Sequence, residues 1–510
     1  MVSRIATLFV ASAFFGPTVW AQQQPVAIVG ATIIDGTDAA PISGGTIVIE
    51  NGKIVAVGTG RNVAVPKNAR KIEARGKYVI PGLIDTNVHI SGFFQSELFA
   101  LYAYGEQDPY AKYGYSLEGA QEALKHGVTT ILDTYGPLLP LMEVRDRINR
   151  GEAVGPRLLV GGNIIGWGGP ASASENGGKP PTPLQHAMNQ WFVQGTGTDL
   201  TTMYPDDVVK AVNRYMDLGP DFIKIGTTSH DIFPPISLTF SAEVHKAIVD
   251  AAHARGLSVT VHSGSVEGHR LAVASGADII THADLVNLEF RPSLLAEICK
   301  SNTYFAPFTN MNRTPDHKHL VDHLTREDAE SVRAQQAVRE ARAKVDNADR
   351  DSTSRLPSAL TNATTGAERH SMANSLMNQQ RLIEGGCKIV IGTDSTPMVP
   401  PGLTPDFLPF YSDMGTGTLS AIEGLVAAGM SPKEALISAT RRGAEATYLI
   451  DKVGTLEAGK SADLVILDAD PLKDIANIRK ISDVMRDGVV IDRKALPTKP
   501  LIYRRDAAAE

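Results

Sequence analysis

The chain is poor in several residue types, and each shortage excludes a class of protein. It has two cysteines in 510 residues, too few for a scaffold held together by disulfides. Its net charge is -7 and no basic stretch stands out, which argues against a nucleic-acid partner. Beyond the N-terminus, no apolar run is long enough for a membrane helix. What remains is a large globular chain, with 43% hydrophobic residues to build its core.

The first 21 residues have the three parts of a secretory signal peptide. A short region with Arg4 precedes an apolar run over residues 5–15, and Val19 and Ala21 supply small residues at cleavage positions −3 and −1. The run is too short to span a bilayer as an uncleaved anchor. We therefore predict cleavage after residue 21, export to the periplasm or the medium, and no membrane attachment afterwards.

The two cysteines, Cys299 and Cys387, each stand just before an apolar run, so both are expected near the bottom of neighbouring strands. An exported protein could join them. We favour separate buried thiols and keep a disulfide as the alternative.

The residue pattern changes twice along the chain. Residues 22–80 contain short β-like runs with Asn51-Gly52 as a hairpin signal, and similar runs return over residues 450–500. Between them, over residues 81–449, apolar strands alternate with helical stretches, which indicates parallel β/α units. Eight strands are expected, the number that closes a (β/α)8 TIM barrel: Leu83–Ile90, Thr129–Asp133, Arg157–Ile164, Asp221–Gly226, Ser258–His262, Asp278–His282, Thr303–Thr309 and Lys388–Asp394.

Helical stretches are expected between these strands, at Leu117–His126, Pro205–Leu218, Ser241–Arg255, Arg291–Lys300 and Pro432–Tyr448. Two polar insertions interrupt the alternation, at Gly166–Asp199 and Thr314–Gln380. Both can be solvated surface. Since loops after barrel strands lie on the catalytic face, a lid over a partly covered site is the functional alternative.

Potential metal ligands stand where the apolar strands end. The segment Val79–Ser91, V-I-P-G-L-I-D-T-N-V-H-I-S, carries Asn87 and His89, and residues two apart in a strand face the same side. Four later strands end in ligand-type residues, namely Lys224, His262, His282 and Asp394. One such residue could be an ordinary buried polar group. Five strand ends of this kind predict a metal-dependent active site.

This order resembles the amidohydrolase superfamily of metal-dependent hydrolases, whose opening signature is P-G-[LF]-[IV]-D-x-H-x-H. The segment Gly454–Asp468 resembles the tail of that family. The resemblance implies a distorted (β/α)8 barrel beside a small composite β-sandwich formed by both chain ends. Asn87 replaces the first histidine, and Asn-x-His is similar to the motif of phenylurea hydrolases and molinate hydrolase. The family context also leaves a homo-oligomer open.

The resemblance implies a chemistry for each residue. Asn87, His89, Lys224, His262, His282 and Asp394 would hold one or two divalent ions, zinc first, with cobalt and manganese as alternatives. A metal-bound hydroxide would attack a carbonyl of a small-molecule amide, urea or carbamate, with His282 and Asp394 as catalytic residues and Asp394 as proton shuttle.

In that family a lysine at the position of Lys224 is carbamylated and bridges two ions. The alternative is a bare ammonium beside Asp394 in a site with one metal. The setting of Lys224 also resembles Xaa-Pro-type imidodipeptidases, which gives a rival function. A catalytically silent barrel retained for binding, with Asn87 as a first lost ligand, is a rival of another class.

Other histidines give weaker signals. His230 follows Lys224 by six residues and is a candidate substrate contact. His317, His319 and His323 do not share one helix face and are expected at the surface. The chain has no G-x-S-x-G elbow and no H-E-x-x-H helix, which argues against serine hydrolases and that class of metalloprotease.

Overall fold

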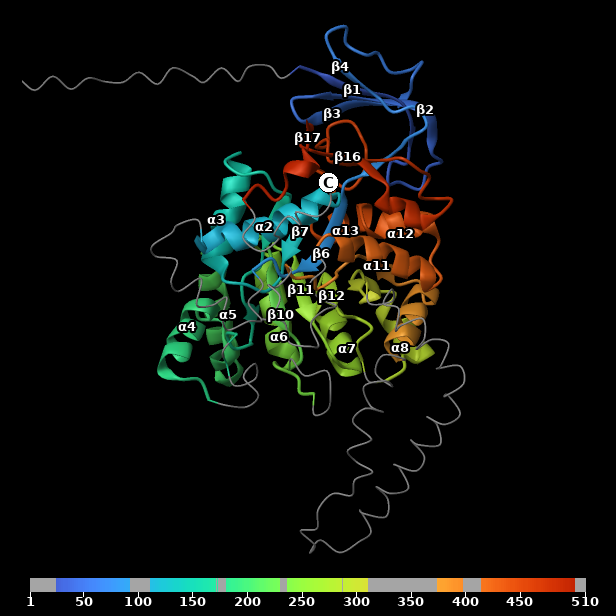
Figure 1. The fold of residues 1–510 in the computed structure, drawn as a ribbon. Helices are drawn as coiled ribbons and strands as arrows, with labels where there is room; N and C mark the ends of the chain where they lie inside the picture. The colour runs from blue at the N-terminus through green and yellow to red at the C-terminus, as the bar shows by residue number, and fades with distance from the viewer. Residues whose placement is uncertain are drawn as a thin grey trace, which may run out of the picture.

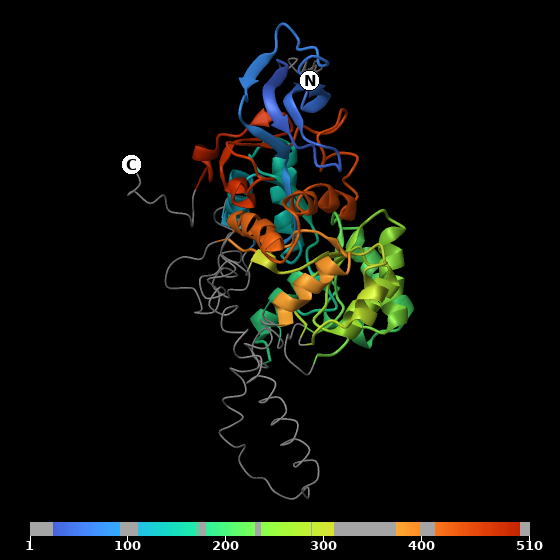
Figure 2. The same cartoon turned by 90° about the vertical axis from the view of Figure 1, so that its right-hand side faces the viewer.

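The computed structural model describes residues 24–91, 111–170, 172, 180–229, 236–286, 288–310, 374–397 and 414–499. Strands from both chain ends form one sheet, which lies above a second part made of parallel strands and helices (Figure 1; Figure 2 gives the view at a right angle). The expected signal peptide and most of the insertion over residues 314–380 lie outside the described residues.

The upper sheet has eight strands in the order β17-β16-β15-β5-β1-β2-β3, with β4 paired to β1. Antiparallel pairing of β5 with β15 joins the two ends of the chain, as predicted. The hairpin between β2 and β3 turns at Asn51 and Gly52, whose φ angles of 50° and 79° suit a two-residue turn. The strands are β1 (Val26–Ile33), β2 (Ile42–Glu50), β3 (Lys53–Thr59), β4 (Arg70–Glu73), β5 (Tyr78–Pro81), β15 (Leu464–Leu467), β16 (Ile481–Arg486) and β17 (Val489–Val490).

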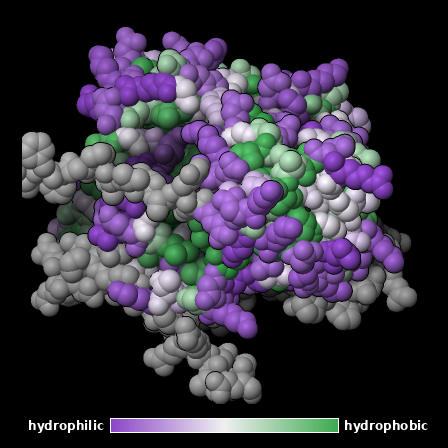
Figure 3. Space-filling view, turned by 90° about the horizontal axis from the view of Figure 1, so that it is seen from above, coloured by the Kyte–Doolittle hydropathy of each residue, from purple (hydrophilic) through white to green (hydrophobic). Residues whose placement is uncertain are grey.

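This sheet has an apolar core of its own, which includes Ile28, Ile47 and Leu464. Seen from above, the molecule presents mainly hydrophilic residues, with apolar residues gathered in patches between them (Figure 3).

The lower part follows the expected β/α alternation. Its strands are β6 (Leu83–Val88), β7 (Val128–Asp133), β8 (Arg157–Val160), β9 (Ile164–Ile165), β10 (Ile223–Gly226), β11 (Val259–His262), β12 (Ile279–Thr281), β13 (Tyr304–Ala306) and β14 (Lys388–Ile389). Its helices are α2 (Ala111–Lys125), α3 (Leu138–Asn149), α4 (Pro183–Val193), α5 (Pro205–Met216), α6 (Ala242–His253), α7 (Val266–Ser275), α8 (Pro292–Ile298), α11 (Thr416–Ala427), α12 (Pro432–Ser438) and α13 (Arg441–Ala446). Within the described ranges, no helix combines the length and the apolar character needed to cross a membrane.

Every expected strand position contains a β-strand, yet among the described residues the strands form two parallel sheets and no closed barrel. One sheet holds β6 to β8 and the other holds β9 to β14. The expected third strand is divided into β8 and β9 at Gly161-Gly162, where Gly162 has a φ of 74°. Backbone hydrogen bonds link the sheets at both edges: the Asp221 amide donates to the Val160 carbonyl at 2.9 Å, and the Thr86 amide of β6 donates to the Ile391 carbonyl at 2.8 Å.

Helix boundaries follow local chemistry. Pro205 starts α5, and Ser241 and Ser265 cap α6 and α7 by accepting backbone N–H groups. The helix expected over residues 432–448 divides into α12 and α13, and at the division the Ala439 carbonyl accepts a hydrogen bond from the Ile84 amide of β6, at 2.8 Å.

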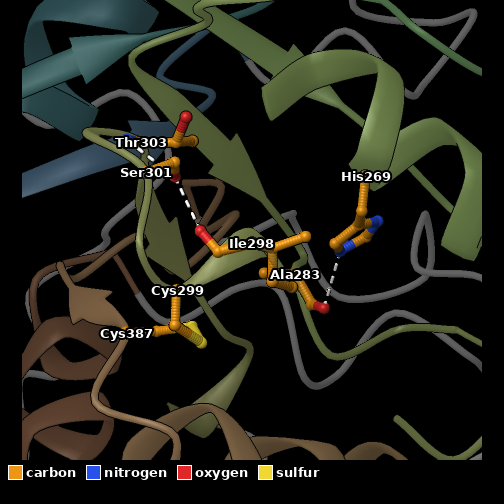
Figure 4. Close-up of a disulfide and its surroundings, with 7 residues drawn as sticks. All are labelled: His269, Ala283, Ile298, Cys299, Ser301, Thr303 and Cys387. Atoms are coloured by element: carbon orange, nitrogen blue, oxygen red, sulfur yellow. Dashed lines mark hydrogen bonds between the residues drawn. A yellow bond between two sulfur atoms is a disulfide. The ribbon is translucent and has the colours of Figure 1, made fainter. Parts of the chain in front are cut away.

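Cys299 and Cys387 form a disulfide, so the expectation of separate thiols is wrong (Figure 4). Cys299 directly follows α8 and Cys387 directly precedes β14. Because β13 and β14 are neighbours in the sheet, both cysteines reach the same end of it, with their Cα atoms 4.2 Å apart.

The disulfide closes a longer contact between residues 284–299 and residues 374–387, which we call the clasp. The buried Asp284 carboxylate accepts hydrogen bonds from Ser375 and from Gln379, the latter at 2.8 Å. Asn378 accepts from the Phe290 amide at 2.8 Å. The clasp therefore fixes the chain on both sides of residues 311–373, which lie outside the described ranges.

Candidate active site

The strand ends of the lower part bring most of the predicted site residues together. Asn87 lies in β6 with His89 just beyond it, Lys224 lies in β10, and His262 ends β11. His282 and Asp394 follow β12 and β14. The Lys224 side chain is almost completely buried, at 1% exposure, which is exceptional for a lysine. Buried polar atoms of this kind need partners, and the neighbouring strand ends supply them.

Asp394 is the centre of the cluster. Its Oδ1 lies 2.7 Å from His89 Nε2 and 3.1 Å from His282 Nε2, and it accepts a hydrogen bond of 3.0 Å from the Asn87 amide nitrogen. Three groups from two different strand ends, those of β6 and β12, thus meet one carboxylate oxygen. Such a carboxylate can hold or release a proton beside two imidazoles.

The Asn87 amide connects this cluster to Lys224. Its Oδ1 accepts hydrogen bonds from Lys224 Nζ, at 3.1 Å, and from the Thr134 hydroxyl. Its Nδ2 faces Asp394 and His282 Nε2, the latter at 3.2 Å. The carbonyl oxygen that we expected to assist a metal therefore points to Lys224 and Thr134, because those are the donors within its reach.

Thr134 was not among the predicted residues. It follows β7, is buried, and also lies 3.0 Å from Lys224 Nζ. Its position directly after an apolar strand was the available signal, but a threonine there is too common to single out.

His262 belongs to the same end of the sheet. Its ring centroid lies 5.2 Å from that of His282 and 4.7 Å from the Trp167 ring. Phe308 stacks on His282 at 5.3 Å, and Tyr135 meets the edge of His89 at 6.3 Å. These aromatic side chains give the imidazoles an apolar surrounding.

Two site residues have unusual backbone angles. His282 and Asp394 have φ angles of 51° and 58°, in the left-handed region that non-glycine residues rarely adopt. Such conformations persist where the surroundings hold them and are typical of functional sites. The buried Asp85 stabilises this region, since its carboxylate accepts hydrogen bonds from the backbone N–H groups of Asn87 and Thr393 and from the Thr393 hydroxyl.

The surroundings shift the pKa values of the cluster. Burial acts to raise the pKa of Asp394, but its contacts with the His282 and His89 imidazoles outweigh burial and hold that pKa well below the ordinary value. Burial lowers the pKa of Lys224 to about 8, against opposing contributions from Asp394 and Asp133. At neutral pH Asp394 is thus a carboxylate, and the Lys224 amine loses its proton more readily than an exposed lysine.

The described residues contain no group of three or more His, Cys, Asp or Glu side chains arranged to hold a metal ion. The donors hydrogen-bond one another through Asp394 instead. Their chemistry still fits such an ion, because two imidazoles and one carboxylate that share a contact point are ligands that zinc takes.

Four histidines whose roles were predicted from the sequence lie outside the described residues. These are the candidate substrate contact His230 and the three expected at the surface, His317, His319 and His323.

Comparisons with known proteins agree with this arrangement. Among solved structures, molinate hydrolase is 27% identical with a TM-score of 0.77, and the match covers 96% of this chain and 99% of that one. Phenylurea hydrolase B is 28% identical with a TM-score of 0.75, covering 94% and 99%. These are the two proteins whose motif the Asn87–His89 pair resembles, and a Xaa-Pro dipeptidase is among the structures that share the fold.

A curated relative matches over a similar length. Imidazolonepropionase of Symbiobacterium thermophilum is 24% identical over 462 residues, which covers 84% of this chain and 85% of that protein. A model of the amidohydrolase family matches residues 78–491, most of the chain. The resemblance inferred from the strand ends is therefore confirmed: the chain belongs to the amidohydrolase family and is a hydrolase.

Proposed function

We propose that the protein hydrolyses a C–N bond at the carbonyl carbon of a small molecule of the amide, urea or carbamate type. The observation that carries the proposal is the meeting of His89, His282 and Asn87 at one oxygen of Asp394. The similarity to molinate hydrolase and phenylurea hydrolase B, over almost the full length of each, supports the choice of substrate class.

The residues that would hold a divalent ion are His89, Lys224, His262, His282 and Asp394, with Asn87 beside them. Zinc suits imidazole and carboxylate ligands, and cobalt and manganese are the alternatives. When bound, such an ion makes water more acidic and polarises a carbonyl oxygen.

Asp394 is the proposed proton shuttle. Its lowered pKa keeps it ionised at neutral pH, so it can take a proton from the attacking water and pass it to the leaving nitrogen. The Asn87 amide holds Asp394 in place by donating to Oδ1. His282 contacts the same oxygen and has Phe308 stacked on its ring, which keeps that ring next to the reacting groups.

Lys224 is proposed to be carbamylated. A neutral amine adds to carbon dioxide to give an N-carbamate and releases one proton, and a pKa of about 8 makes the neutral amine accessible. The product is an anion. An anion suits a position among residues that would bind a metal cation better than a positively charged ammonium does.

The wider assignments belong to the same proposal. A signal peptide over residues 1–21 would export the enzyme to the periplasm or the medium, and the Cys299–Cys387 disulfide supports an oxidising compartment. Residues 81–449 would form a distorted (β/α)8 barrel, with residues 22–80 and 450–500 as the two parts of a flanking β-sandwich. The joint sheet of both chain ends supports this division.

A hydrolysis screen tests the function. Purified protein would be assayed on N-acyl amines, phenylureas, carbamates and Xaa-Pro dipeptides with added zinc, cobalt or manganese, with Asp394→Asn as the matched control. Turnover of the first three classes by the wild type alone would support the proposal. Turnover of the dipeptides only would favour an imidodipeptidase, and neither turnover nor metal binding would favour a silent binding protein.

A further inference from the structure

A buried histidine that the proposed mechanism does not use connects the two strand ends that carry His262 and His282. His269 lies on α7 with 0% exposure. Its Nδ1 lies 2.9 Å from the hydroxyl of Ser263, and its Nε2 lies 2.9 Å from the carbonyl oxygen of Ala283. Ser263 directly follows His262, and Ala283 directly follows His282. Figure 4 shows the bond to Ala283.

The hydrogen-bond partners assign the tautomer. The Ser265 carbonyl also lies 2.9 Å from Nδ1, but it already accepts the backbone N–H of His269. The Ala283 carbonyl needs a donor, so the ring proton belongs on Nε2. Nδ1 then accepts the Ser263 hydroxyl proton, since it lies 2.9 Å from that hydroxyl and the other acceptor in reach, the Ser265 carbonyl, lies 3.3 Å away. One neutral imidazole thus links both strand ends by a donor on one side and an acceptor on the other.

The packing leaves this imidazole little freedom. A Cβ added to Gly268 would lie 2.5 Å from Ser263 Oγ, so the start of α7 presses directly on the strand-end loop. Phe290, within the clasp, meets the His269 ring at a centroid distance of 5.5 Å. Because His282 has the rare φ of 51°, its conformation depends on contacts of this kind in its immediate neighbourhood.

We propose that His269 is a positioning residue that sets the separation of the His262 and His282 rings, and with it the affinity of the site for a divalent ion. This inference rests on the proposed function. The geometry that it concerns, the placement of two side chains, can be measured without a substrate. The separation at issue is the 5.2 Å between the ring centroids.

Zinc affinity, measured by competition with a chromogenic chelator, tests the proposal. His269→Leu removes both hydrogen bonds and should weaken zinc binding by about tenfold or more, the scale known for groups that orient metal ligands. His269→Gln keeps a donor for Ala283 and should recover most of the affinity.

His245→Leu is the matched control. His245 is equally buried and bonds two hydroxyls, those of Thr227 and Ser275. The backbone amide of Thr227 donates to the His262 carbonyl at 3.0 Å, but the hydrogen bonds of His245, unlike those of His269, do not connect that strand end to the one that carries His282. It should lower thermal stability about as much as His269→Leu while leaving zinc affinity within about twofold of the wild type. An equal loss of affinity in His245→Leu would overturn the proposal, because the effect would then be a general loss of packing.

Crystal structures of the wild type and His269→Leu supply the second measurement. The ring separation should change in His269→Leu and stay the same in His245→Leu, and an unchanged separation would refute the proposal. If His269→Leu does not fold, Ser263→Ala takes its place in both measurements, because that variant removes one of the two hydrogen bonds of the His269 ring. A wild type that hydrolyses no substrate would defeat the proposed function and leave these comparisons in force.

Discussion

Replacing Asp394 by asparagine is the most informative single change. The new amide would keep an oxygen for the Asn87 side chain but would lose the negative charge that accepts a proton. We expect kcat to fall at least about a hundredfold, the usual scale for losing a general base. That corresponds to about 2.7 kcal/mol in the activation barrier.

The effect on folding should be smaller than the effect on catalysis. Hydrogen bonds to a charged group contribute about 1.5–3 kcal/mol, but burying the charge offsets part of this, and asparagine retains an acceptor. The pH dependence has a definite sign. Because the pKa of Asp394 is lowered in the folded state, its stabilisation is present above about pH 4, the ordinary value, and is lost as the pH falls through the folded-state pKa.

Steady-state kinetics and urea unfolding, each run from about pH 3 to about pH 8, separate the two effects. Asp463→Asn is a matched control, since Asp463 is buried directly before β15 of the upper sheet and its carboxylate is bonded there to Arg157 and to the Asp487 amide. It should lower the free energy of unfolding without a comparable fall in kcat. If Asp394→Asn keeps near-normal kcat, the base is another residue, with His230 the next candidate.

Three further predictions concern the metal and its ligands. A chelator should abolish activity and added metal should restore it, while His262→Ala and His282→Ala should each lose bound metal and turnover; full activity in the stripped enzyme would contradict this. Lys224→Ala should lose reactivation by bicarbonate, and a bare amine in a high-resolution map of the metal-loaded wild type would exclude a carbamate. Asn87→His should raise the metal content, counted by atomic emission, towards two ions per chain; two firmly held ions in the wild type would show that the asparagine costs no affinity.

The sequence allowed prediction of which strand ends matter. Lys224, His262, His282 and Asp394 each close an apolar run, and parallel strands in one sheet end on the same side. The structure brings Asn87, Lys224, His282 and Asp394 into a connected set of contacts on that basis.

Other features depend on which segments become neighbours, and no periodicity reveals that. The direction of the Asn87 amide follows from Thr134 lying beside it. The disulfide depends on β13 and β14 being adjacent in the sheet. The break in the third strand follows from the left-handed angle of Gly162, which its residue type permits but does not require.

The Cys299–Cys387 bond also determines what a single break in the chain would do. The bond spans 88 residues of sequence, so a peptide bond cut anywhere between the two cysteines leaves both pieces in one covalent molecule. The cut protein would run as one species on a gel without reductant and as two with it. The hydrogen bond between Asp284 and Gln379 in the clasp would remain, and we expect the enzyme to persist as a two-chain protein.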